Sequence, residues 1–190
     1  MITYKQVDET YFNLYDEVPM VVHVKTVLIP RHLDNGLGGI IFDEVAVEPY
    51  IRNIAYQNAS GYKKDFDISN WAFFMAFDED KPVGAVTAVS KTKDIGMLDK
   101  RDDLCVLWDI RIDDAYKGMG VGTKLFNMVK DWSRNNNLKQ IKIECQTNNV
   151  PACKFYAKQG AVLRKYDEYT CLNFHDVREH EIEVIWYLDL

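Results

Sequence analysis

The chain has 190 residues, of which 47% are hydrophobic and 27% charged, proportions that favour one globular domain over residues 1–190. Its net charge is −6 and no basic patch dominates the sequence, which argues against a nucleic acid or an anionic membrane as partner. The N-terminus lacks the cationic start and apolar core of a signal peptide, and no apolar run reaches the roughly 18 residues of a membrane helix, so we expect a cytoplasmic protein.

Residues 1–20 are polar and tyrosine-rich and show no clear pattern of secondary structure. Alternating β-branched residues predict a strand over Met20–Ile29, and a glycine-rich turn separates it from a second expected strand, Ile40–Val47. Proline suits the first turn of a helix, so we expect a short helix over Pro49–Gln57. The polar stretch 58–67 then predicts a loop.

A β-hairpin is the next predicted element. Its strands are Trp71–Phe77 and Val83–Ser90, joined by the tight connection Asp78–Pro82. The polar segment Lys91–Asp103 predicts a longer loop after the hairpin.

The strand Leu104–Ile112 follows, with acids and apolar residues interleaved. Strict alternation assigns its side chains to two faces, one with Val106, Trp108, Ile110 and Ile112 and the other with Cys105, Leu107, Asp109 and Arg111. An acid among so many apolar residues is costly unless it is paired or functional, so Asp109 is a candidate site residue.

A glycine-rich loop leads from this strand into a helix. Gly118, Gly120 and Gly122 precede or open a helix predicted over Val121–Asn135, with one apolar face made of Leu125, Met128, Val129 and Trp132. Glycines before a helix allow the backbone to approach a ligand and direct its N–H groups toward an anion. The loop therefore predicts a phosphate-bearing ligand.

The last third predicts a strand, a helix and two further strands. Asn148 and Asn149 are good N-caps, Pro151 fits the first helical turn, and Gly160 closes the helix, in which Ala152, Phe155 and Tyr156 share a face. The predicted strands around this helix are Ile141–Gln146, Val162–Leu172 and Glu183–Asp189. Glu144 is a second acid in an apolar strand. The order of elements predicts a mixed α/β sheet with a right-handed βαβ unit.

No metal site is expected. The four cysteines, at 105, 145, 153 and 171, form no C-x-x-C pair, and three of them lie in or near apolar patterns and suit small core residues in a reducing compartment. His175 and His180 are five residues apart, so they do not share one helical face and are expected at the surface.

Two common phosphate motifs do not match the loop. A P-loop requires lysine directly after its last glycine, whereas Thr123 follows Gly122. The dinucleotide fingerprint requires a glycine three residues after Gly120, and that residue is again Thr123. The segment from Lys117 to Gly122 resembles instead the acetyl-CoA loop, Arg/Gln-x-x-Gly-x-Gly/Ala, of the GNAT superfamily of N-acetyltransferases. Lys117 replaces the usual first residue.

A second motif resembles the same superfamily. Its pattern, Asn-x-x-Ala-x-x-x-Tyr-x-x-x-Gly, is matched by Asn149, Ala152, Tyr156 and Gly160, although Ala161 replaces the usual aromatic residue. The resemblance implies a mostly antiparallel central sheet flanked by helices, with a splayed parallel βαβ unit.

A closer resemblance is to streptothricin acetyltransferases, which acetylate an amine on the β-lysine part of that antibiotic. The matching blocks lie between Met20 and Leu190 and are Ile29–Arg31, Glu48–Ile51, Asp109–Ile110, Glu144–Asn149, Ala152–Tyr156 and Trp186–Leu188. This implies acetyl-CoA as co-substrate, no metal, a small cationic amine as acceptor, and antibiotic resistance as the biological role.

The resemblance also implies residue roles. The cofactor would be held by the backbone of Ile110, Arg111, Ile112, Lys117, Gly118, Met119, Gly120, Val121, Gly122 and Thr123, and by Asn149 and Ala152. A backbone N–H near Arg111 or Ile112 would stabilise the oxyanion. Tyr156 is the candidate general acid, because a phenol is protonated at neutral pH and can donate to a departing thiolate.

Several alternatives stay open. Asp109 or Glu144 could receive the amine or act as a base through water, or Asp109 could form a structural ion pair with Arg111 or Lys142. The acceptor could also be a protein N-terminus, a lysine or a polyamine, and the chain could be a CoA-binding regulatory module without turnover. The resemblance allows a homodimer.

Overall fold

The computed structural model describes residues 1–54, 57–173 and 181–190. The chain divides into two compact units. The first comprises Met1–Val21, Asn53–Ile143 and Tyr187–Leu190, and the second comprises Val22–Arg52 and Glu144–Trp186. That residues 1–190 act as one domain stays a prediction.

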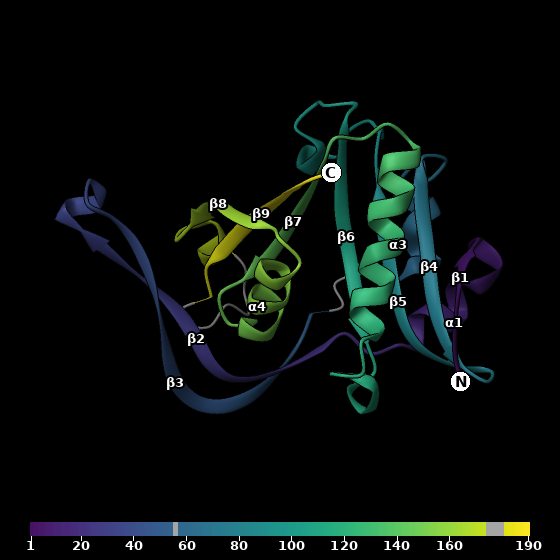
Figure 1. The fold of residues 1–190 in the computed structure, drawn as a ribbon, viewed down its shortest axis with the longest axis horizontal. Coiled ribbons are helices and arrows are strands. Elements are labelled where there is room, and N and C mark those ends of the chain that lie inside the picture. Colours follow the sequence, from purple (N-terminus) through teal and green to yellow (C-terminus); the bar gives the residue numbers. More distant parts are fainter. Residues whose placement is uncertain (55–56, 174–180) are drawn as a thin grey trace. The chain divides into compact units, whose positions relative to one another are not determined.

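A seven-stranded sheet has the order β1-β4-β5-β6-β7-β9-β8 (Figure 1). Its strands are β1 Ile2–Val7, β4 Trp71–Asp78, β5 Lys81–Val89, β6 Leu104–Ile112, β7 Gln140–Gln146, β8 Val162–Asp167 and β9 Glu183–Asp189. β1 pairs with β4, β4 with β5 and β5 with β6, all antiparallel, whereas β6 and β7 pair in parallel. The predicted mixed, mostly antiparallel α/β fold is confirmed.

The helices are α1 Phe12–Asp16, α2 Tyr62–Asp65, α3 Val121–Asn135 and α4 Val150–Lys158. α3 lies along β4, β5 and β6 (Figure 1). It buries Leu125 and Val129 as predicted, together with Val121, Phe126 and Ser133, whereas Met128 and Trp132 are only half-buried. The 3.6-residue period of an amphipathic helix therefore predicted the buried face of α3 correctly, apart from Met128 and Trp132 beside it.

An aromatic core fills the first unit. Trp71, Phe73 and Tyr62 from β4 and α2 lie with ring centroids 5.3–6.3 Å apart, and Phe66 and Trp108 pack at their edge. β4 is buried at every position except its last, Asp78, because α3 packs against it and aromatic side chains of α1 and α2 contact Phe73 and Trp71. α1 and α2 are each only about one turn long, so they would not be stable on their own. Burial of the large aromatic rings stabilises them in the first unit.

Two N-terminal elements lie where the sequence showed no pattern. β1 pairs with β4 from Ile2 opposite Asp78 to Val7 opposite Phe73. α1 then buries Phe12 and Tyr15. Both elements are too short for a periodic signal, so they are defined by what they pack against.

The predicted helix over Pro49–Gln57 is wrong. β2 Val21–Leu33 and β3 Gly39–Asn53 form a two-stranded sheet, and β3 runs through Pro49. Most β3 side chains are exposed, so no alternation of buried and polar residues marks the strand. Proline is tolerated in such an exposed strand because a missing N–H costs little at a sheet edge. Ala55 and Tyr56 lie outside the described residues.

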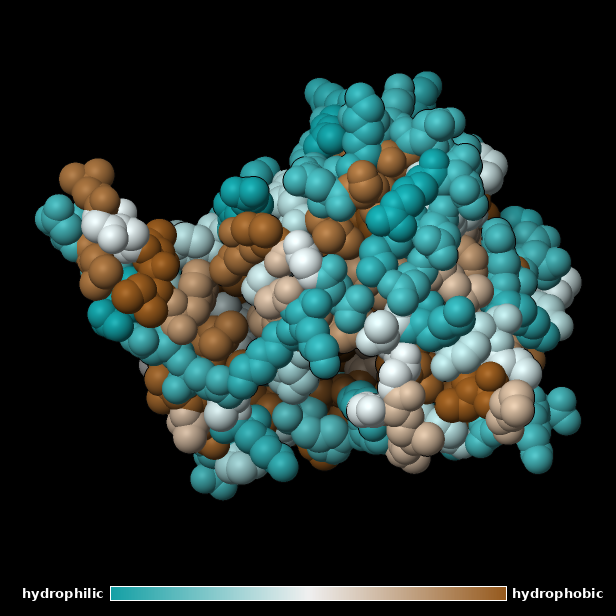
Figure 2. Space-filling view, viewed as in Figure 1, coloured by the Kyte–Doolittle hydropathy of each residue, from teal (hydrophilic) through white to brown (hydrophobic). Residues whose placement is uncertain are grey.

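The second unit contains this hairpin. Figure 2 shows hydrophobic residues toward the turn end of the hairpin, and Leu37, in the turn between β2 and β3, is 90% exposed. Both strands contact the rest of the second unit, since Leu28 N–H of β2 donates to the carbonyl of Thr147 at 3.0 Å and Phe42 of β3 packs edge-on against Tyr166 with ring centroids 5.5 Å apart.

Two further boundaries differ from prediction. The expected loop 58–67 contains α2, and the expected strand Val162–Leu172 ends at Asp167. The Asp167 carboxylate accepts hydrogen bonds from the backbone N–H groups of Tyr169 and Thr170, at 2.8 and 3.1 Å, and so turns the chain out of the sheet. His175 and His180 lie outside the described residues.

All four cysteines are free thiols and buried. The sulfur atoms of Cys145 and Cys153 are 3.5 Å apart. Within the described part of the chain, His, Cys, Asp and Glu side chains form no group of three or more that could hold a metal ion. Among the described helices, none combines the length and apolar character that crossing a bilayer requires.

Candidate functional site

The glycine loop enters α3 through two left-handed backbone conformations. Gly118 has φ +80° and Gly120, the N-cap of α3, has φ +86°. A Cβ at either position would meet no atom within 4 Å, so the glycines serve the backbone conformation and leave open space beside it. The first N–H groups of a helix have no acceptor within the helix, so this end of α3 can bind an anion.

Side chains of neighbouring strands hold the start of the loop. The Asp113 carboxylate accepts from the N–H of Ala115 at 3.0 Å and pairs with Lys81 at 2.8 Å, and the hydrogen bond from Lys81 lowers the pKa of Asp113. Tyr116 donates to Asp78 at 3.0 Å. The ammonium of Lys117 contacts Asp114 at 2.5 Å and donates to the Val21 carbonyl at 3.2 Å.

Close packing at Gly84 fixes α3 against the sheet. A Cβ at Gly84 would lie 3.0 Å from both Leu125 Cδ1 and Val121 Cγ1, and 3.1 Å from Ile112 Cδ1. The missing side chain lets the first turn of α3 approach β5. The loop is therefore held in place at both of its ends.

The predicted alternation along β6 is wrong beyond Trp108. Thr87 on β5 faces Asp109, but Ala88 faces Leu107, so Trp108 is the extra residue of a β-bulge. Val106 belongs to the aromatic core, whereas Ile112 lies beside Leu125 and Val121 of α3. Because the extra residue reverses the faces after it, Asp109 lies on the same side as Val106 instead of opposite it.

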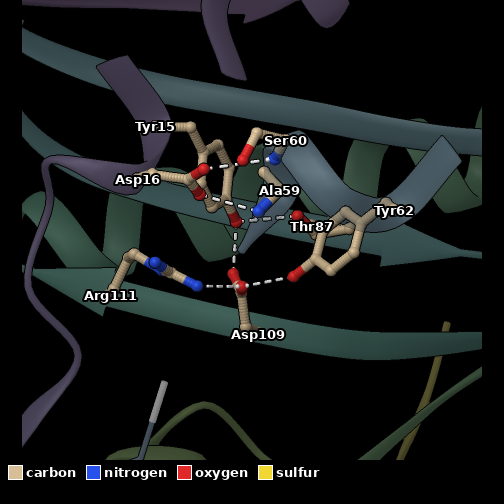
Figure 3. Close-up of polar contacts among 8 residues, drawn as sticks. All are labelled: Tyr15, Asp16, Ala59, Ser60, Tyr62, Thr87, Asp109 and Arg111. Atoms are coloured by element: carbon tan, nitrogen blue, oxygen red, sulfur yellow. Dashed lines mark hydrogen bonds and ion pairs between the residues drawn. The ribbon is translucent and has the colours of Figure 1, made fainter. Parts of the chain in front are cut away.

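Asp109 is at the centre of a buried polar cluster (Figure 3). Its Oδ1 accepts a short hydrogen bond from the Tyr15 hydroxyl, and its Oδ2 accepts from Tyr62 at 3.0 Å and from Arg111 Nη2 at 2.6 Å. Tyr15 also shares a 2.7 Å hydrogen bond with Thr87. The ion pair with Arg111 is one of the structural pairings expected from the sequence. The other candidate, Lys142, pairs with Asp99 at 2.8 Å.

Burial sets the protonation of the cluster. Burial first, and the Asp109 charge second, raise the pKa of Tyr15 and of Tyr62, so both phenols stay protonated and donate. Burial is the largest single effect on the Arg111 guanidinium and lowers its pKa, but the charge and hydrogen bond of Asp109, together with the two tyrosines, outweigh it and the pKa is raised. Asp109 therefore receives hydrogen bonds from three donors.

The remaining predicted site residues lie in the second unit. Asn149 is the N-cap of α4, and its side-chain oxygen accepts from the N–H of Ala152 at 3.3 Å. Tyr156 is buried on the face of α4 that also contains Val150 and Cys153, with the Phe155 ring 5.5 Å away. Glu144, in contrast, is exposed on β7.

The structure thus brings together Asp109 and Arg111 on one strand and adds three residues to them that the sequence did not indicate, Tyr15, Tyr62 and Thr87. The strand β6 pairs with β7 from Leu104 opposite Gln140 to Leu107 opposite Ile143, and then continues to Ile112.

Known proteins share this architecture. A structure of a Bacillus anthracis protein described as a streptothricin acetyltransferase, in complex with acetyl coenzyme A, has a TM-score of 0.77 and 23% identity, with all of both chains covered. A nourseothricin acetyltransferase has a TM-score of 0.76 and 17% identity, with 99% of this chain and 98% of that chain covered. At these identities the likeness shows the fold.

Sequence relatives point the same way. The streptothricin acetyltransferase of Escherichia coli is 29% identical over 139 residues, which cover 70% of this chain and 74% of that protein. Streptothricin acetyltransferase A of Bacillus subtilis strain 168 is 33% identical over 79 residues, 42% of this chain and 44% of its own. The model of the acetyltransferase (GNAT) family matches residues 41–161, more than half of the chain. This protein is therefore a member of the acetyltransferase (GNAT) family and an enzyme of the acyltransferase class.

Proposed function

We propose that this acetyltransferase moves the acetyl group of acetyl-CoA to a primary amine of streptothricin. The observation that carries the proposal is the pair of left-handed glycines, Gly118 and Gly120, which open the backbone at the N-terminus of α3. The names of the relatives support the acceptor, and the acetyl-CoA bound to the Bacillus anthracis protein supports the donor.

The loop fits a diphosphate. Backbone N–H groups from Lys117 to Thr123 would hold it, helped by the partial positive charge of the α3 N-terminus. Since backbone groups do the binding, an exposed side chain such as Met119, 64% exposed, is free to vary. The edge of β6 at Ile110–Ile112, beyond the last residue that pairs with β7, would pair with the amides of the pantetheine arm, like an added strand. Acetyl-CoA supplies the activated acyl thioester.

Tyr156 would protonate the departing thiolate. Its place on a helix capped by Asn149 supports this role, because a rigid element holds a catalytic hydroxyl better than a loop does. An N–H near Arg111 or Ile112 would stabilise the oxyanion that forms when the amine attacks the thioester carbonyl.

Glu144 would receive the amine. Asp109 is less suited, because it is buried and its two oxygen atoms already accept hydrogen bonds from three donors, with which a substrate ammonium would have to compete. An exposed carboxylate such as Glu144 can bind a cation from solvent or accept its proton through water.

Release of the free thiol of CoA from acetyl-CoA tests the proposal, with streptothricin, a peptide N-terminus, a lysine peptide and a polyamine as acceptors. We expect turnover with streptothricin and at most a small fraction of it with the others. Faster turnover of a peptide or polyamine would replace the acceptor. Binding of CoA without thiol release on any amine would indicate a regulatory module.

A further inference from the structure

We propose that Tyr15, Tyr62 and Arg111 are positioning residues: through Asp109 they hold the β-bulge of β6, and thereby the backbone of Ile110–Ile112, in the register that acetyl transfer requires. This inference rests on the proposed function, in which that backbone segment receives the acetyl donor. None of the three side chains needs to touch either substrate.

Three separate elements meet at one carboxylate. Tyr15 comes from α1, Tyr62 from α2 and Arg111 from β6 itself, and none is more than 3% exposed. The two oxygen atoms of Asp109 thus accept three hydrogen bonds (Figure 3). Such charge-assisted hydrogen bonds in a region of low dielectric constant are strong and directional.

A second carboxylate joins the two helices to each other. Asp16, next to Tyr15, accepts from the N–H of Ala59 at 2.7 Å and of Ser60 at 3.2 Å, just before α2 begins (Figure 3). Tyr15 and Tyr62 are therefore presented to Asp109 by helices that are hydrogen-bonded together. Displacing α1 from the segment before α2 would have to break the hydrogen bonds to Asp16 as well as those to Asp109.

Stability alone does not account for the cluster. Replacing a buried ion pair by apolar residues of similar volume is often neutral or stabilising, because desolvation cancels much of the attraction. Moreover, Arg111 leaves its buried Nε–H without an acceptor among the described residues, which is itself costly. A cluster that costs stability and is centred on one position of β6 is better explained by a role in fixing the geometry of that strand.

The geometry that it fixes is the register after the bulge. Without the extra residue, Asp109 would turn toward α3 and Ile110 would face the tyrosines, since a slip of one residue exchanges the two faces of a strand. That arrangement would bury a carboxylate among apolar side chains and leave two phenols without their acceptor. The cluster therefore favours the register in which Arg111 faces Ala85 and Ile112 faces Gly84.

Tyr62→Phe tests the inference, because it keeps the ring in the aromatic core and removes only the hydroxyl. Tyr11→Phe is the matched control: Tyr11 packs against the same core, but its hydroxyl accepts from Lys5 at 2.9 Å. We expect kcat to fall roughly tenfold in Tyr62→Phe, with the Kd for CoA unchanged within twofold. Amide hydrogen exchange of the peptide containing Ile110–Ile112 should become faster, and the control should change neither quantity.

Thr87→Val, which removes the hydrogen bond to Tyr15 at similar volume, provides a milder second variant if Tyr62→Phe does not fold. Folded variants with kcat within twofold of the parent and unchanged exchange would overturn the inference, as would a loss of thermal stability alone. A shift in the acid limb of the pH–rate profile of Tyr62→Phe would also overturn it, because Asp109 would then act as an acid or base. If the parent enzyme acetylates none of the amines, the proposed function fails, and the exchange measurement still decides whether the cluster holds the bulge.

Discussion

Asp109 and Arg111, two residues apart on β6, form a buried ion pair with 2.6 Å between Oδ2 and Nη2. The side chains are 5% and 2% exposed, so water does little to screen either charge. Strand neighbours at this spacing share a face, and the pairing is therefore built into the strand itself.

Breaking this pair should be far more harmful than removing it. We expect Arg111→Met to lower the free energy of unfolding by about 3–5 kcal/mol, because it leaves the Asp109 carboxylate buried without its cation. The double variant Asp109→Leu with Arg111→Met should recover part of that loss, because no unpaired charge is left, while the phenols of Tyr15 and Tyr62 lose their acceptor. Urea titration measures both. Lys81→Met, which breaks the exposed pair with Asp113, is the control and should leave the midpoint nearly unchanged.

Gly120→Val should raise the KM for acetyl-CoA about tenfold or more without unfolding the protein. The side chain would have space, but a β-branched residue is strained at φ +86°, and relief of that strain would move the N–H groups at the start of α3. Steady-state kinetics with varied acetyl-CoA measures the effect. Gly96→Val is the matched control, since that glycine also has open space but no positive φ. An unchanged KM in a folded Gly120→Val protein would exclude the loop as the diphosphate site.

Tyr156→Phe should reduce kcat by about 10²-fold or more, the usual contribution of a positioned general acid, and leave the Kd for CoA intact. The ring remains, so the buried face of α4 keeps its packing. Pre-steady-state or steady-state thiol release gives kcat, and calorimetry gives the Kd. Tyr169→Phe, at a side chain 75% exposed, serves as control. Near-normal turnover would remove Tyr156 from the mechanism.

Alkaline pH should weaken the fold through the tyrosines of the Asp109 cluster. Their pKa values are raised in the folded protein by burial and by Asp109, so the folded state holds these protons more tightly than the unfolded chain does. The stabilisation is complete below the unfolded pKa of about 10 and decreases as the pH rises above it.

Urea midpoints measured from pH 8 to pH 11 test this expectation. The double variant Tyr15→Phe with Tyr62→Phe should show a flatter decline above about pH 10, whereas Tyr11→Phe should follow the parent. Equal slopes in the double variant and the parent would contradict the assignment.

Local sequence signals were sufficient for the elements that carry the loop. The bounds predicted for β6 and α3, Leu104–Ile112 and Val121–Asn135, match the structure. Alternation and helical period are properties of neighbouring residues, and the glycines mark the helix start directly. The N-cap at Asn149 was also predicted, for the same reason.

The Asp109 cluster needed information that no short stretch contains. Tyr15 and Tyr62 are separated from Asp109 by 94 and 47 positions, and neither belongs to a motif. The bulge at Trp108 arises from pairing with β5, so alternation within β6 alone assigned Asp109 to the wrong face. The strand predicted over Ile40–Val47 lies within β3, but the end of β3 was wrongly predicted as a helix for a related reason, because the strand has few buried residues to mark its period.

The burial of the four cysteines has a practical consequence. Desolvation raises the pKa of Cys105 to about 12 and that of Cys171 to about 11, and native thiols of this kind react slowly with alkylating reagents. A cysteine introduced at an exposed position such as Leu37 or Tyr169 would therefore react with a maleimide dye well ahead of the native ones. Fluorescent or spin labels can thus be attached at either of these two positions of the second unit while the native sequence is otherwise kept.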